Sequence, residues 1–396
     1  MASFPHYYSG VTINSPKPGT NKYSLKSKRV RNRGLLAAGL VIVSACTRLQ
    51  LDIHTPDVPP DPAVLARVIL VGDAGRPDPG VLESVRAWSE IAPDRTSVVF
   101  LGDNVYEKGL PEGPAYREKA VLDKQIAAVG SSRGLFVPGN HDWRSGRTGI
   151  NRQAAYVEAN RPSIRFRPTN GCPGPATDDE LDGIVLVALD TEWLLQTSPD
   201  STGCDLGDKP LRMISQQIHE VLDAAGKELV IVVAHHPPWT YGRHGGFYNW
   251  QDHIFPLTRL FSKAWIPLPV VGSIYPLGRK ILAQVQDTFS QRYRSVHVQL
   301  ATAFSVYEGP APLIFAGGHD HSLQVLSRRD PWDYVLVSGA GSSGKLTTVT
   351  RGPDTIFARL AHGFITVDLY PGGRVLLRVI EAGDHGVIFT HWLATE

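Results

Sequence analysis

Five short clusters of polar residues contain side chains that bind metal ions. They are Asp73 in GDAG, Asp103 and Tyr106 in GDNVY, Asn140 and His141 in GNHD, His235 in VVAHH, and His319 and His321 in GHDH. Carboxylate, phenol and amide oxygens, together with imidazole nitrogens, are suitable ligands for hard or borderline metals. One HxH pair could simply be two solvated loop histidines, so the metal site is predicted from the five clusters together.

Each cluster follows an apolar run of strand length, and these runs must position the polar groups. The runs are RVILV, SVVFL, GLFV, ELVIVVA and PLIFA, with helical patterns such as residues 80–92 and 210–226 between several of them. Alternating strands and helices predict an α/β fold, and strands that follow one another without helices near the end predict mixed sheets. Ligands of open α/β sheets bind beyond the carboxyl ends of the strands, so the clusters should converge there.

The ordered set GDAG, GDNVY, GNHD, VVAH and GHDH resembles the calcineurin-like metallophosphoesterases, and within them the purple acid phosphatases of the small, tartrate-resistant type. All five blocks occur in order between Gly72 and His321. Where most metallophosphoesterases carry DxH in the first block, this chain has Gly75, and it gains Tyr106 in the second. The resemblance implies a four-layer α/β/β/α sandwich with mixed sheets.

The resemblance also implies two metal ions that share one carboxylate. Carried over by position, the first ion takes Asp73, Tyr106, His321 and Asp103, and the second takes Asn140, His235, His319 and the same Asp103. The first set gathers more negative charge, which favours a trivalent ion beside a divalent one. The expected pair is Fe(III) with Fe(II), Zn(II) or Mn(II).

Such a metal pair predicts an acid phosphatase that hydrolyses small phosphate monoesters by attack of a metal-bound hydroxide. The leaving group still needs a proton, for which His141 is the first candidate, with Asp142 expected to orient it. His244 resembles a second substrate histidine of the small purple acid phosphatases. A phosphodiesterase acting on nucleotides or lipid headgroups is the alternative enzyme. A non-catalytic binding lipoprotein of the cell envelope is the alternative from another class.

The charge balance gives no reason to expect binding to a nucleic acid scaffold. Among 396 residues, 40 are Lys or Arg and 38 are Asp or Glu, a formal net charge of +2. Basic residues do gather before the uncharged stretch Gly34–Ala45, which is too short to span a bilayer but fits the apolar centre of a secretory signal. A plain cleaved signal and an uncleaved anchor are alternatives to the lipoprotein signal described next.

The sequence VSAC, ending at Cys46, resembles a bacterial lipobox, so a lipidated Cys46 would hold an exported protein at the cell envelope. The expected domains are a lipoprotein signal peptide at 1–45, a proline-rich tether at 46–66, the catalytic domain at 67–384 and a tail at 385–396. Within the catalytic domain, an insertion at about 249–293 is interpreted either as a surface that contacts lipid or a partner, or as helices packed on the domain.

Cys172 and Cys204 form a candidate disulfide in an oxidising compartment.

Overall fold

The computed structural model describes residues 63–394, except 249, 256, 258–263, 269–271, 275–277, 279–283, 328, 345 and 384–385. The expected signal segment 1–45 and most of the expected tether therefore lie outside the described residues. The described residues belong to one compact unit that spans 53–396.

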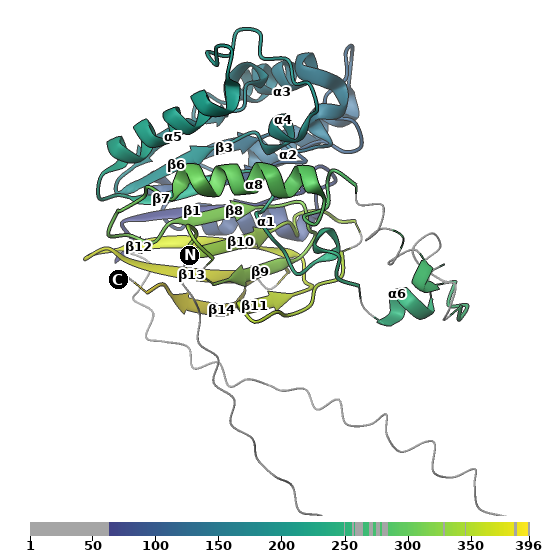
Figure 1. The fold of residues 1–396 in the computed structure, drawn as a ribbon. Coiled ribbons are helices and arrows are strands. Elements are labelled where there is room, and N and C mark those ends of the chain that lie inside the picture. Colours follow the sequence, from purple (N-terminus) through teal and green to yellow (C-terminus); the bar gives the residue numbers. More distant parts are fainter. Residues whose placement is uncertain are drawn as a thin grey trace, which may run out of the picture. The chain divides into compact units, whose positions relative to one another are not determined.

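Two mixed sheets of seven strands form the centre of this unit (Figure 1). The first has the order β14-β13-β12-β1-β2-β3-β4, with β1 Ala66–Val71, β2 Thr96–Leu101, β3 Arg133–Val137, β4 Ile164–Phe166, β12 Gly363–Tyr370, β13 Arg374–Glu381 and β14 Gly386–Trp392. The second has the order β11-β9-β10-β8-β7-β6-β5, with β5 Ala176–Leu181, β6 Ile184–Ala188, β7 Leu229–Val233, β8 Ile314–Gly317, β9 Leu323–Leu326, β10 Tyr334–Ser338 and β11 Thr355–Arg359. Strands β1 to β4 pair in parallel, as do β6 to β8.

Helices cover the outer face of each sheet, which gives four layers. The described helices are α1 Pro79–Ser89, α2 Tyr116–Ala128, α3 Gly146–Asn160, α4 Thr191–Leu195, α5 Pro210–Ala225, α6 Trp250–Ile254 and α8 Gln291–Phe304, with 3-10 turns at Pro93–Arg95, Asp142–Ser145, Thr169–Gly171 and Arg243–Gly245. Helices α1, α2 and α3 pack on the first sheet, and α5 and α8 pack on the second. The layered fold expected from the sequence is confirmed.

The alternation of side chains along each strand explains the layers, because successive residues point to opposite faces. In β1, Val68 and Leu70 pack in the core between the sheets, whereas Ile69 and Val71 pack against the α1 side. Strand β7 follows the same rule on the other sheet. Strands buried on both faces need continuous apolar runs, which is the pattern seen in the sequence.

Three expected boundaries need correction. The segment 385–396 is not a tail, because residues 386–392 form β14 and pair with β13 as an edge strand. The tether does not reach residue 66, because Val64 is buried against Tyr370 and Leu376, and β1 begins at Ala66. The insertion ends before residue 293, because α8 starts at Gln291 and packs on the second sheet. No helix in the described part of the chain is long and apolar enough to cross a bilayer.

Cys172 and Cys204 form a disulfide, as the sequence predicted. Arg147, near the start of α3, reinforces this connection. Its Nη2 donates to the carbonyl oxygen of Thr202 at 2.6 Å, and its Nε donates to that of Asn170 at 2.7 Å. The bridge and the arginine therefore fasten two loops to the helix that follows the GNHD cluster.

Candidate metal centre

The carboxyl ends of parallel strands from both sheets bring the predicted ligands together. Asp73 follows β1, Asp103 follows β2 and Asn140 follows β3, while His235 follows β7 and His319 follows β8. The amide of Gly72 donates to Ser338 O at 2.7 Å, which joins the two sheets beside the site. Ligand atoms of Asp73, Asp103 and His235 all lie within 4.8 Å of one another.

Three of these residues have a left-handed backbone although none is glycine. The φ angles are +60° at Asp73, +52° at Asp103 and +68° at His319. Such a conformation costs about 1–3 kcal/mol per residue and tends to occur at functional sites, where the surroundings enforce it. The strain therefore points to this strand edge as the functional part of the domain.

The structure gives a steric reason for the paired change at Gly75 and Tyr106. A Cβ atom at Gly75 would lie 2.6 Å from the backbone nitrogen of Tyr106 and 2.6 Å from Asp103 O. Real Cβ atoms do not approach backbone atoms so closely. A histidine at position 75 would displace the loop that carries the tyrosine, so the two features exclude each other in this backbone.

Tyr106, Asp73 and His321 form the first set of contacting groups, here called the Asp73 half. Tyr106 Oη donates to Asp73 Oδ1 at 3.0 Å and lies 3.1 Å from His321 Nε2. The distance between His321 Nε2 and Asp73 Oδ1 is 3.3 Å. Donors bound at about 2.1 Å to one ion would lie about 3 Å apart, so this triangle fits a single metal ion.

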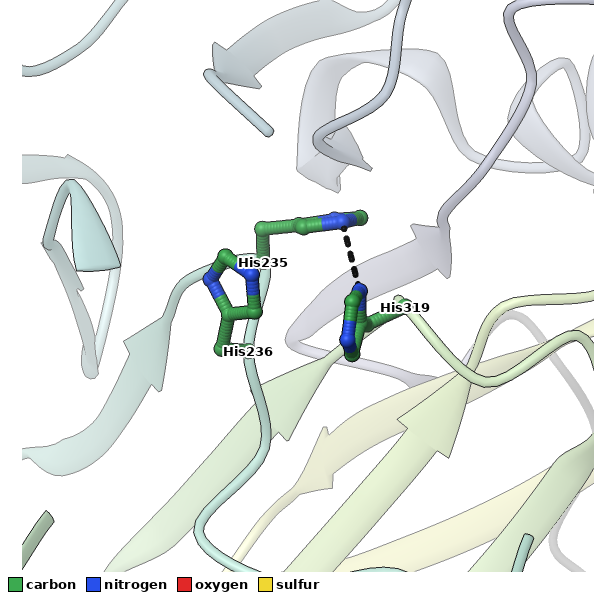
Figure 2. A group of neighbouring side chains, drawn as sticks. All are labelled: His235, His236 and His319. Atoms are coloured by element: carbon green, nitrogen blue, oxygen red, sulfur yellow. Dashed lines mark hydrogen bonds between the residues drawn. The ribbon is translucent and has the colours of Figure 1, made fainter. Parts of the chain in front are cut away.

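Asn140, His235 and His319 form the second set, here called the His235 half. His235 Nε2 lies 3.1 Å from Asn140 Oδ1, 3.3 Å from His319 Nδ1 and 3.5 Å from Asp103 Oδ1. Figure 2 shows the contact between the ring nitrogens of His235 and His319, whose planes are nearly perpendicular. Asp103 lies between the halves, and it belongs to a potential ligand group with Asp73 and His235.

Backbone carbonyls fix the far side of both imidazoles in the His235 half. His235 Nδ1 lies 2.8 Å from Leu101 O, and His319 Nε2 lies 2.8 Å from Gln286 O. A carbonyl accepts only from a protonated nitrogen, so in the neutral form of each ring the opposite nitrogen carries the lone pair that can bind a metal. The donor set therefore fits metal ions in both halves.

Ionisation in the Asp73 half involves pairing of opposite charges. Burial alone would raise the pKa of Asp73. The neighbouring His321, His235 and Tyr106 lower it by more, so the net shift of the pKa is downward. Burial likewise opposes the charged form of His321, yet Asp73 raises the pKa of that imidazole to about 9. Burial, Asp73 and Asp103 raise the pKa of Tyr106 well above 10. Without a metal, the imidazole of His321 is therefore protonated at neutral pH, and the phenol of Tyr106 is neutral.

The pKa values of the two histidines in the His235 half shift in opposite directions. Burial and the neighbouring His244 and His236 lower the pKa of His319 well below its usual value. Burial also lowers the pKa of His235, but Asp103 and Asp73 outweigh it and the net shift is upward. His319 is thus neutral and ready to bind a metal.

His141 lies beside the shared carboxylate with part of its ring exposed. Its backbone nitrogen donates to Asp103 Oδ1 at 2.7 Å, and its Nε2 lies 3.9 Å from Asp103 Oδ2. The ring meets Tyr106 edge-on, with centroids 4.6 Å apart. Since 19% of the side chain is exposed, His141 can reach a molecule that enters the site.

Asp142 does not orient His141, contrary to the expectation from the sequence. His141 Nδ1 instead lies 2.8 Å from Glu107 O. Asp142 is fully buried and accepts from the backbone nitrogens of Gly139 at 2.8 Å and Val105 at 3.0 Å. Burial and nearby Asp103 raise its pKa to about 7. Asp142 therefore joins the GNHD loop to the GDNVY loop.

His244 packs on the His235 half. Its ring lies 3.9 Å from that of His319, centroid to centroid. His236 is buried beside His235 and His319 and forms a further group of potential metal ligands with them, while its Nδ1 lies 2.8 Å from Thr191 Oγ1. Buried Asp320, between His319 and His321, accepts from Thr240 Oγ1 at 2.8 Å and from the backbone nitrogen of His244 at 3.2 Å.

Two residues at the site were missed by sequence reasoning, namely Gln286 and Asp287. The carbonyl of Gln286 contacts His319, and Asp287 Oδ1 lies 3.2 Å from His244 Nδ1. Both lie within the expected insertion, where no motif or hydrophobic period marks them. The contact with His244 could be found only from the structure.

Comparison with known proteins identifies the family. The model of the calcineurin-like phosphoesterase family matches residues 66–323, and the chain belongs to this family. A search of curated proteins found no match.

Many solved structures share the fold, and two of them are compared with this chain. One is GAP50, described as the anchor in the inner membrane complex of Plasmodium, with a TM-score of 0.50 and 16% identity over 84% of this chain and 89% of that chain. The other is the purple acid phosphatase PPD1 from yellow lupin seeds, with a TM-score of 0.50 and 15% identity over 83% of this chain and 53% of that chain. At these identities the likeness concerns the fold alone.

Proposed function

We propose that this metal-dependent phosphoesterase is an acid phosphatase that hydrolyses small phosphate monoesters with two metal ions. The observation that carries the proposal is the arrangement of six donor side chains in two contacting sets of three, with Asp103 between them. Bound ions would hold phosphate oxygens, neutralise their charge and activate water. The contact between the phenol of Tyr106 and Asp73 supports Fe(III) in the Asp73 half, with Fe(II), Zn(II) or Mn(II) in the other.

His141 and His244 are the proposed substrate residues. Both are partly exposed, and they come from opposite sheets, next to the Asp73 half and the His235 half respectively. His141 Nδ1 faces a backbone carbonyl, so its Nε2 is the nitrogen available to exchange a proton with the leaving group. His244 would contact the phosphate ester from the other side.

The test is phosphate release by the purified protein, measured together with its metal content. We expect about two ions per chain and faster hydrolysis of an aryl phosphate monoester than of the matching bis-aryl diester. A preference for the diester would favour the phosphodiesterase alternative. A protein that binds both ions and hydrolyses neither ester would favour a binding or anchoring role, such as the one the Plasmodium protein's description names.

We also propose that lipid on Cys46 anchors the protein at the outside of a bacterial membrane. The support is the basic segment, the apolar stretch and the VSAC sequence before the folded domain. Deleting residues 1–46 should release a soluble protein that keeps its metals and activity, because no predicted ligand precedes Asp73. Loss of the metals in the truncated protein would contradict the proposed domain boundary.

A further inference from the structure

His244 and Thr288 are far apart in the sequence but lie in contact, so the segment between them begins and ends at the same place. The backbone nitrogen of Thr288 donates to His244 O at 2.9 Å, and Thr288 Oγ1 donates to the same oxygen at 3.3 Å. The two ends of this segment therefore meet at a proposed substrate histidine. Residues 284–290, here called the returning arm, lie beside the metal centre.

Gln286 of the returning arm contacts histidines on the second sheet. Its carbonyl oxygen lies 2.8 Å from His319 Nε2, and its side-chain Oε1 lies 2.6 Å from His236 Nε2. Its Nε2 donates to Glu192 Oε2 at 2.8 Å. These contacts hold the arm in place next to the His235 half.

Asp287 is the arm residue that contacts His244. Its side chain is fully buried, and Oδ1 lies 3.2 Å from His244 Nδ1. Its Oδ2 accepts from the backbone nitrogen of Gln284 at 3.3 Å, so the carboxylate is held by its own loop. A fixed, buried carboxylate beside one ring nitrogen selects the tautomer that is protonated there.

The backbone of His244 is fixed from the opposite direction. Asp320 Oδ1 accepts from His244 N at 3.2 Å, and a Cβ atom at Gly242 would lie 2.5 Å from the Asp320 carboxylate. The loop is thus packed closely against the GHDH turn. Asp320 thus contacts the backbone of His244, whereas Asp287 and His319 contact its ring.

We propose that Asp287 is a positioning residue for His244: it accepts the Nδ1 proton and holds the ring against His319, in the orientation in which it meets the phosphate ester. The catalytic part of this inference rests on the proposed function. The orientation of His244 does not, because it follows from contacts within the chain. An insertion would then supply a residue that the five family motifs lack.

Nitrogen NMR of the full chain, labelled at histidine and loaded with zinc alone, tests the orientation without any substrate. We expect His244, assigned from the spectrum of His244→Ala, to carry its proton on Nδ1. Asp287→Ala should move the proton toward Nε2, whereas Asp287→Asn, which can still accept, should largely keep it on Nδ1. The control Asp182→Asn, an exposed change in the turn between β5 and β6, should leave the signal unchanged. An unchanged His244 signal in a folded Asp287→Ala protein would overturn the proposal.

A double-mutant cycle tests the consequence for catalysis. Asp287→Ala and His244→Ala should each slow hydrolysis of a phosphate monoester by about 10²-fold with metal content unchanged. The double variant should be no slower than His244→Ala, because Asp287 acts through that ring. Losses that multiply would overturn the proposal. If the unaltered protein hydrolyses no ester, the proposed function fails, and the NMR result alone decides the role of Asp287.

Discussion

The Asp73 half and the His235 half of the centre differ in what their groups carry before a metal binds. In the first, protonated His321 pairs with the ionised Asp73 beside a neutral phenol. In the second, His319 is neutral and its Nδ1 already faces the shared space. Metal binding in the Asp73 half must therefore displace protons, while much of the His235 half is prepared for metal.

This difference supports the proposal that the strand edge holds two unlike ions. Displacing protons from a phenol and an imidazolium requires a strongly polarising ion, which then gains anionic oxygen ligands. The neutral imidazole of His319 and the amide oxygen of Asn140 suit a divalent ion. The contrast comes from the residues of each half, since Asp103 contributes to both.

The largest effect is expected at Asp103, the residue that the comparison assigns to both halves. Asp103→Ala should remove both ions and slow ester hydrolysis by roughly 10⁴-fold, since each ion contributes several kcal/mol to transition-state stabilisation. Metal analysis and initial rates measure this, with Asp182→Asn as the control. Retention of one full equivalent of metal would show that Asp103 serves a single half.

His141 should affect turnover without affecting either half as a metal site. His141→Ala should keep both ions and lower the turnover number by about 10² to 10⁴, the usual effect of losing a general acid. The measurement is kcat alongside metal content. A parallel loss of metal would show that His141 is itself a metal ligand, so the assignment of ligands to the two halves would be wrong.

Tyr106 should distinguish the halves by their spectra. If Fe(III) binds the phenolate, the protein should be purple, and Tyr106→Phe should abolish the visible band and weaken metal retention in the Asp73 half alone. Asn140→Ala should instead weaken metal retention in the His235 half and leave the colour. A colourless protein with two divalent ions, indifferent to Tyr106→Phe, would contradict the iron assignment.

The smallest effect is expected at His297, a buried histidine of helix α8. His297 packs on Tyr293, and burial lowers its pKa to about 3. Between about pH 3 and 6.5 the unfolded chain therefore binds a proton that the folded chain does not, and this residue lowers the free energy of unfolding by about 1.4 kcal/mol per pH unit of acidification.

Replacing His297 by Phe should remove that contribution. Relative to the unaltered protein, His297→Phe should gain about 2 kcal/mol in free energy of unfolding between pH 7 and pH 5, as measured by urea titration. His219→Gln, on the partly buried surface of α5, is the control. Equal changes with pH in the two proteins would show that His297 titrates normally.

The sequence predicted the layers and the five clusters that lie together in the structure, because both depend on local patterns. Buried strands need apolar runs, and turns at their carboxyl ends carry the polar groups. Asp142 was misinterpreted because adjacency to His141 says little about direction, and its side chain is buried between two loops. Strand β14 was missed because it is a partly exposed edge strand without a continuous apolar run. Asp287 was missed because its partner lies across an excursion that has no periodic pattern.

The left-handed backbone at Asp73, Asp103 and His319 lowers the stability of the metal-free domain at residues that are proposed to bind metal. Glycine adopts this conformation without strain, so His319→Gly should relieve about 1–3 kcal/mol while removing a proposed ligand. The domain carries this strain at three positions beside its proposed metal centre. Bound ions would offset the strain, so part of the free energy of metal binding would be used to hold the ligands in this conformation.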